Sequence, residues 1–171
     1  MEMRKLRLCN LKRAPWRITD DGPCTETTNV VASLTRHGQL RPILVRPIEL
    51  PDYQIIDGHV VVDAAHKVPA LREELFCVVH NLDERQALVL YLHLKLNRTV
   101  KNHIKIRQAF ERFRELNEGK THKCVEELHQ AIAWPRERIE AYLQLSESDL
   151  RWIRAGHHFP DDKSSDAKFK L

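Results

Sequence analysis

Long hydrophobic runs are missing from this sequence: its apolar stretches extend over only a few residues, whereas a membrane-spanning helix needs about 20. Glycine and aromatic residues are also scarce, with five glycines in 171 residues and an aromatic content of 6%. A secretory signal pattern is absent as well, because residues 1–13 contain no apolar core. We therefore expect a cytoplasmic protein that has no membrane partner.

Closely spaced cysteine pairs are missing too. The four cysteines lie far apart, with no C-x-x-C pair among them: Cys9, Cys24, Cys77 and Cys124. Structural zinc sites and disulfide frameworks need closely spaced or regularly patterned cysteines. We therefore predict reduced thiols and no metal site.

The residues that are abundant describe a folded globular protein, with 42% apolar and 30% charged side chains. The formal net charge is only +4, but the charge is unevenly distributed. Residues 1–17 contain six basic residues and one acid, and residues 95–123 contain nine basic residues and three glutamates. Basic patches of this kind indicate a polyanionic partner, although a solvated helix surface has the same composition.

The first half of the chain alternates between strand and helix patterns. Strands are predicted over residues 6–11, 42–48, 53–58 and 75–81, and helices over residues 26–37 and 59–68. Gly38 is expected just after the end of the first helix, and Asp57-Gly58 marks the break before the second. This alternation within about eighty residues predicts a small α/β layer.

From residue 83 onward every pattern is helical. Helices are predicted over residues 83–97, 101–119, 121–132, 133–145 and 146–156, with N-caps at Asp83 and Thr121 and with Pro135 at a first helical position. The segment 101–119 is the most amphipathic one, because its apolar residues recur at helical spacing: Ile106, Ala109, Phe110 and Phe113. Only a few residues around Ala133 separate the third helix from the fourth, which is helix-turn-helix spacing.

Three segments, in this order, resemble the ParB family. They are "SLTRHGQLRPILVRP" at 33–47, "YQIIDGH" with the following "DAA" at 53–65, and "LKLNRT" at 94–99. In that family a ParB/sulfiredoxin-type N-terminal domain precedes a helical DNA-binding domain, and the resemblance covers roughly residues 5–150. It implies an α+β protein with a small α/β domain in residues 1–82, an all-helical helix-turn-helix domain in residues 83–155, and a polar flexible tail in residues 156–171.

The resemblance also implies where a nucleotide would bind. Domains of this family commonly bind a nucleoside triphosphate, which is CTP in the DNA-partition members. The positions of this chain that match the family's nucleotide contacts lie in three separate segments: Gly38, Gln39, Arg41, Pro42, Gly58, His59 and Asn97.

Two of these segments depart from the family pattern. In the Gly-Glu-Arg-Arg-type segment, Glu is replaced by His59 and the two arginines are replaced by Val60 and Val61. Leu96 replaces the acidic residue before Asn97, which removes a candidate Mg²⁺ ligand. Each lost charge-assisted hydrogen bond to phosphate contributes about 1.5–3 kcal/mol, so binding should weaken by about 10²- to 10⁴-fold. We therefore predict no cofactor and no working CTP switch, with CTP or ATP together with Mg²⁺ as the alternative.

An enzyme is the first alternative. Members of this fold include sulfiredoxin, whose reactive Cys is replaced by His59 here, and a phosphotransferase branch. A Mg²⁺-dependent nuclease or small-molecule phosphotransferase would use the polar residues of the same turn, Asp57, His59 and Asp63. A second alternative is an adaptor that binds another protein.

DNA binding is the leading prediction. In a helix-turn-helix the second helix enters the major groove, and its first residues reach base edges, which here are Arg136 and Arg138. The remaining candidate contacts to double-stranded DNA are Lys101, Lys105, Arg107, Arg112, Arg114, Thr121 and Lys123. Glu137 and Glu140 leave the recognition element itself nearly neutral. The function expected is plasmid or chromosome segregation or transcription regulation, in a mobile element for example, and any homodimer would form through one of the two halves.

Overall fold

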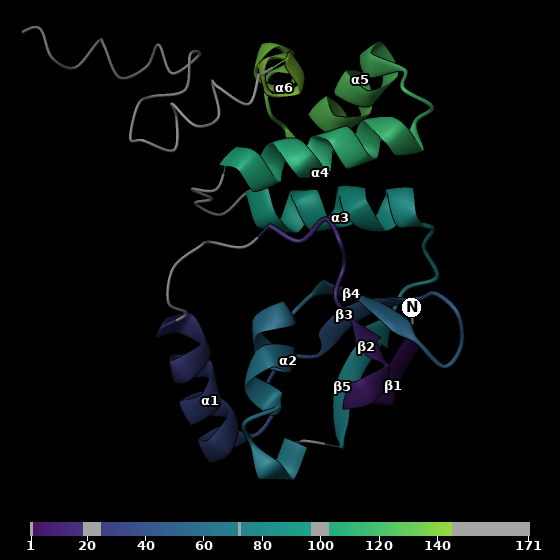
Figure 1. Cartoon of the computed structure of the whole chain (residues 1–171). Helices are drawn as coiled ribbons and strands as arrows, with labels where there is room; N and C mark the ends of the chain where they lie inside the picture. Colours follow the sequence, from purple (N-terminus) through teal and green to yellow (C-terminus); the bar gives the residue numbers. More distant parts are fainter. Residues whose placement is uncertain (1, 19–24, 72, 97–102, 145–171) are drawn as a thin grey trace, which may run out of the picture.

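A mixed β-sheet with two helices on one side lies below four further helices in the computed structural model of the chain (Figure 1). The described residues are 2–18, 25–71, 73–96 and 103–144. The predicted helix at 146–156 and the predicted tail at 156–171 lie outside them. No helix among the described residues is long and apolar enough to span a membrane.

The sheet has five strands in the order β1-β5-β3-β4-β2. The β1–β5 and β3–β4 pairs are antiparallel, and the β3–β5 and β2–β4 pairs are parallel. Their bounds are β1 Glu2–Arg7, β2 Leu11–Lys12, β3 Ile43–Pro47, β4 Tyr53–Asp57 and β5 Glu74–Val79.

The predicted strand at 6–11 is wrong. A 3₁₀ turn at Leu8–Asn10 separates β1 from β2, and the backbone N–H of Leu8 donates to the carbonyl of Glu73. Leu6, Leu8 and Leu11 are all buried in the sheet core. The three-residue step from Leu8 to Leu11 does not match the two-residue repeat of a strand, so the chain must turn between them.

Two helices, α1 Thr25–His37 and α2 His59–Ala65, lie on one side of the sheet, where α2 packs against the strands and α1 packs against α2 (Figure 1). Helix α2 places Val62 and Ala65 against the inward residues of β3 and β4. The predicted end of α1 is confirmed, because Gly38 has a left-handed φ of 69° and its N–H donates to the carbonyl of Leu34.

The four upper helices are α3 Glu84–Leu96, α4 His103–Leu116, α5 Thr121–Ile132 and α6 Arg136–Gln144. The N-cap at Asp83 is confirmed: its carboxylate accepts the N–H of Gln86, and the Gln86 side chain accepts the N–H of Asp83. The predicted inward face of α4 is also confirmed, since Ile106, Ala109, Phe110 and Phe113 are buried.

The core of these helices extends into the sheet half of the chain. Trp16 and Ile18, from the extended segment after β2, and Ile56 of β4 belong to the same buried cluster as α3–α6. Leu88 and Leu92 of α3 are fully buried in this cluster. A continuous core therefore joins the two halves, and the domain boundary at residue 82 stays a prediction.

Two predicted helix starts need correction. Lys120, not Thr121, is the N-cap of α5, and no side chain caps that end. Pro135 lies just before α6, and its carbonyl accepts the N–H of Ile139. The backbone N–H of Cys124 donates to the carbonyl of Lys120, which places the N-cap one residue before Thr121.

Candidate functional site

The strand–glycine–helix turn between β4 and α2 has the shape that its sequence predicts. Gly58 is the N-cap of α2 with φ of 93°, a left-handed conformation that favours glycine. A Cβ atom at this position would lie 3.2 Å from Cγ1 of Ile43, so both the backbone and the packing favour glycine. No side chain, including that of Asp57, caps the helix.

His59 lies inside the protein and is only 6% exposed. Its ring meets the ring of Tyr91 edge-on, with 6.2 Å between the centroids. Burial, followed by the nearby positive charge of Arg17, lowers the pKa of His59 from 6.5 to about 3. Its Nε2 atom has no hydrogen-bond partner among the described residues. His59 is therefore a neutral, buried imidazole next to the turn.

Asp63 carries the negative charge of α2, and it is bound by two arginines from the extended segment after β2. Arg13 Nη2 lies 2.6 Å from one carboxylate oxygen of Asp63, and Arg17 Nη2 lies 3.1 Å from the other. Sequence reasoning missed both arginines, because nothing local relates positions 13 and 17 to position 63. They attach the extended segment to α2.

Gln39 connects the loop after α1 to the sheet. Its Oε1 accepts the backbone N–H of Phe76 at 2.7 Å, and its Nε2 donates to the carbonyl of Phe76 at 2.8 Å and to that of Arg41 at 2.9 Å. The amide thus bonds to β5 as a further strand residue would. Arg41 and Pro42, which follow in the same predicted nucleotide segment, are exposed.

A nucleoside triphosphate would need cations at this turn, and the residues present supply few. The first turn of α2 is His59–Val62, which contains a neutral buried imidazole and three valines. Arg13 and Arg17 already bind Asp63, and Asn97 lies outside the described residues. No group of three His, Cys, Asp or Glu residues in the described part of the chain is arranged to hold a metal ion. The turn thus differs in chemistry from a triphosphate site.

The helix-turn-helix consists of α5, the residues 133–135 and α6. Ala133 has a left-handed φ of 58°, and its N–H donates to the carbonyl of His129. The inward residues of α6 are buried as predicted: Ile139, Tyr142 and Leu143. Arg136 and Arg138 are exposed. The two arginines predicted to reach DNA therefore lie on the outer side of the second helix.

Arg136 is paired with Glu126 of α5. Its Nε and Nη2 atoms donate to the two carboxylate oxygens at 2.8 and 2.9 Å. The pKa of Glu126 is lowered to about 2, mainly by this contact and next by the hydrogen bond from Gln130. The sequence places Glu126 and Glu127 close to the recognition helix, and the structure shows that Glu126 binds Arg136 directly.

Arg138 contacts an aromatic ring instead of a carboxylate. Its guanidinium carbon lies 4.1 Å from the centroid of the Trp134 ring. Trp134 itself packs against Phe110 and Tyr142, with centroid separations of 6.0 and 5.7 Å. Trp134 lies four positions before Arg138, and this helical spacing could have identified the contact from the sequence.

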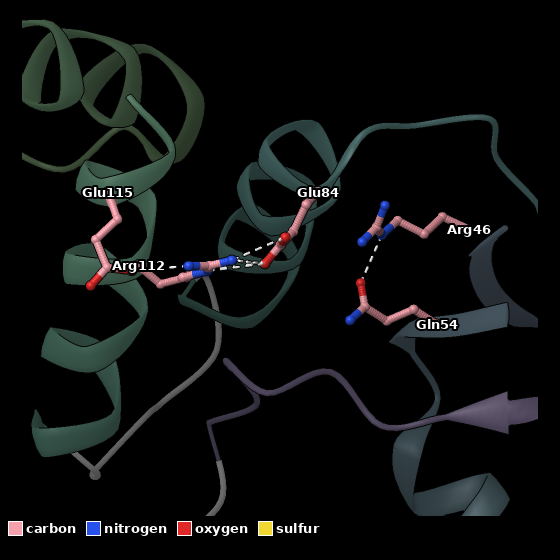
Figure 2. A network of polar contacts seen from close by, with 5 residues as sticks. All are labelled: Arg46, Gln54, Glu84, Arg112 and Glu115. Atoms are coloured by element: carbon pink, nitrogen blue, oxygen red, sulfur yellow. Dashed lines mark hydrogen bonds and ion pairs between the residues drawn. The ribbon is translucent and has the colours of Figure 1, made fainter. Parts of the chain in front are cut away.

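Other predicted DNA-binding cations form ion pairs within the helical region. Figure 2 shows Arg112 of α4 next to Glu84 of α3, with hydrogen bonds of 3.0 and 3.1 Å; its other partner is Glu115. The hydrogen bonds that Arg112 donates to Glu115 and Glu84 raise its pKa. Figure 2 also shows Arg46 of β3, whose Nε atom donates a 2.7 Å hydrogen bond to the side chain of Gln54 of β4.

The remaining predicted contacts differ in exposure. Arg107 binds Glu111 one helical turn away at 2.7 Å. Lys105 and Arg114 are half-buried on α4, whereas Thr121 and Lys123 are exposed in the first turn of α5. Lys101 lies outside the described residues. The most accessible predicted contacts thus lie on α5 and α6.

Comparison with known proteins supports the resemblance seen in the sequence. Residues 2–96 match the family described as the ParB N-terminal domain. Among curated proteins, none matches the sequence significantly.

Solved structures share the fold of this chain. The C-terminally truncated chromosome-partitioning protein ParB from Caulobacter crescentus, complexed to the centromeric parS site, matches with a TM-score of 0.59 and 21% identity, over 91% of this chain and 80% of that chain. ParB of C. crescentus complexed with CTP-γ-S matches with a TM-score of 0.50 and 22% identity, over 91% and 86% of the two chains. A Pnob8-like ParB-N domain gives a TM-score of 0.58 and 16% identity, over 88% and 66%. With the match to more than half of its residues, the chain belongs to the family of the ParB N-terminal domain.

Proposed function

We propose that this protein binds double-stranded DNA through α5 and α6, in segregation or in transcription regulation, and that its DNA binding does not respond to CTP. The observation that carries the first part is the helix-turn-helix itself. A three-residue turn joins two helices, and the inward side of the second helix is buried while Arg136 and Arg138 remain exposed. This is the arrangement in which a recognition helix enters the major groove.

The ion pairs of the surface arginines are compatible with this proposal. The side chains of Arg136 and Glu126 are 48% and 36% exposed. Exposed ion pairs in water contribute little net stability, because water solvates both partners and salt screens them. A DNA phosphate, which brings charge and counterion release, can therefore replace the glutamate.

The second part of the proposal depends on the turn at Gly58. Val60 and Val61 offer no donor to a phosphate, and His59 is buried and neutral. Gln39 already binds the backbone of Phe76, and both nearby arginines bind Asp63. Protein groups thus already engage the Gln39 amide and the two arginines that bind Asp63, which leaves Arg41 as the exposed cation of the predicted nucleotide segment. The same observations speak against the enzyme alternative, because His59 is buried and Asp63 is bound by two arginines.

Equilibrium binding to a random-sequence DNA duplex at increasing salt tests the proposal. We expect salt-dependent binding, and Lys123→Gln should reduce the slope of log K against log salt by about one unit, because one phosphate contact is lost. Lys67→Gln is the matched control: Lys67 is exposed just after α2, and its substitution should leave the slope unchanged. Absence of binding at low salt would contradict the proposal, and the adaptor and enzyme functions would then need to be tested.

A further inference from the structure

The two exposed arginines of α6 are held in chemically different ways. Arg136 uses its N–H edge: Nε and Nη2 both donate to Glu126. Arg138 uses its flat face, which lies 4.1 Å from the ring centroid of Trp134. The donors of a guanidinium group point outward in its plane, so stacking on a ring leaves them available, whereas a bidentate ion pair does not.

The ring that holds Arg138 is itself fixed. Trp134 lies at the turn between α5 and α6, and its contacts with Phe110 and Tyr142 attach it to the buried helical core. Side chains on a helix point back toward its N-terminus, so Arg138 extends over the start of α6 toward Trp134. The ring thus gives the guanidinium group a defined place, which lowers the side-chain entropy that binding costs.

We propose that Arg138 is the residue of α6 that recognises guanine, and that Trp134 is a positioning residue for it. This inference depends on the proposed DNA binding. An arginine with two free, coplanar donors fits O6 and N7 of guanine in the major groove. Arg136, whose Nε–Nη2 edge binds Glu126, contributes charge toward the phosphates instead. Glu137 and Glu140 lie on the same helix, but among the described residues Arg138 stacks on the ring of Trp134 and forms no ion pair with either glutamate.

Selection of preferred sites from a random DNA duplex pool, followed by affinity measurements, tests the assignment. The unmodified protein should enrich a guanine at one position of its site. Arg138→Lys keeps the charge but removes the planar donors, so it should lose about 5- to 150-fold of the preference for that guanine while salt-dependent binding remains. Arg136→Lys, the matched control, should keep the guanine preference.

Variants of the ring test the positioning role. Trp134→Leu should reduce the same guanine preference without removing the positive charge, and Trp134→Phe should retain part of it, because a phenyl ring still offers a face to the guanidinium group. Circular dichroism verifies that each variant is folded, since Trp134 also packs in the core. If Trp134→Leu does not fold, the Arg138→Lys and Arg136→Lys pair decides alone.

A guanine preference that survives Arg138→Lys would overturn the inference, and so would a preference that is lost with Arg136→Lys instead. A protein that binds DNA with no base preference would also overturn it while the proposed function stands. Failure to bind any duplex at low salt would overturn the proposed function, and this assignment with it.

Discussion

His59, in the turn after β4, is buried, whereas a nucleotide-binding residue would face solvent. It lies under the ring of Tyr91 and near Arg17, with 6% of its surface exposed. Because a charged imidazole would be poorly solvated there, the protein keeps it neutral. The position that the family resemblance assigns to nucleotide binding thus contributes packing in this chain.

The pH dependence of stability follows from this burial. The pKa of His59 is about 3 in the folded protein and about 6.5 when unfolded. Below pH 6.5 the unfolded chain takes up a proton that the folded protein excludes, so the free energy of unfolding falls as the pH falls, until about pH 3. At pH 5 the loss should be about 2 kcal/mol relative to pH 8, measured by urea denaturation.

His59→Leu is the comparison that isolates this effect. The variant should lose about 2 kcal/mol less than the unmodified protein between pH 8 and pH 5. His103, whose pKa burial and Arg138 also lower, is present in both proteins, so its contribution cancels. Equal losses in the two proteins would mean that His59 is protonated in the folded state.

If α6 binds DNA as proposed, Glu126 competes with DNA for Arg136. Glu126→Gln should raise DNA affinity a few-fold at low salt, because both donors of Arg136 become free. Glu140→Gln removes the same charge from the same surface without releasing an arginine, so its smaller gain measures the general electrostatic effect. Equal gains in the two variants, in fluorescence anisotropy titrations, would show that the ion pair does not compete with DNA.

At the scale of elements, the turn between α5 and α6 contains a strained residue. Ala133 has φ of 58°, a conformation in which the Cβ atom of any residue except glycine is crowded. The turn nevertheless ends α5 and sets the direction of α6, and the N–H of Ala133 bonds to the carbonyl of His129. The recognition element is therefore held at a conformational cost.

Ala133→Gly should remove that cost and raise the free energy of unfolding by about 1 kcal/mol. Ala141→Gly, within α6, is the matched control and should lower the same quantity by about 1 kcal/mol, because glycine disfavours a helix interior. Chemical denaturation measures both. A destabilising effect of Ala133→Gly would contradict the assignment of a strained left-handed turn.

Local patterns made most elements predictable. The apolar repeat of α4 identified both the helix and its buried face, and Asp83 and Gly38 marked helix ends correctly. The strand predicted at residues 6–11 failed because Leu8 and Leu11 both turn inward, which requires a 3₁₀ turn between them. The conformation of such a segment depends on tertiary contacts, which the local sequence pattern does not contain.

The candidate site was predictable in outline only. Spacing around Ala133 and Pro135 located the helix-turn-helix, and the exposure of Arg138 followed from the position of its buried neighbours. The partners of the charged residues could not be read in the same way. Arg112 binds Glu84, which is 28 positions earlier, and Asp63 binds Arg13, which is 50 positions earlier. No local period relates such residues, so the sequence overstated the number of free cations on α4.

At the scale of the whole molecule, a continuous core joins a sheet layer to the helices that carry the proposed DNA-binding surface. Trp16, Ile18 and Ile56 pack into the same cluster as α3–α6. Arg13 and Arg17 fix the segment that carries Trp16 to Asp63 of α2. Protein side chains thus make the connection between the turn at Gly58 and the helices, and we infer that no nucleotide is required for it.

We propose that this protein binds DNA independently of CTP. The most direct measurement is its affinity for a DNA duplex selected from a random pool, titrated at one fixed salt concentration with and without CTP and Mg²⁺. We expect the same dissociation constant in both titrations. A change in affinity on addition of CTP would contradict this proposal. The turn of Val60 and Val61 would then bind a triphosphate without the arginines on which the family's site depends.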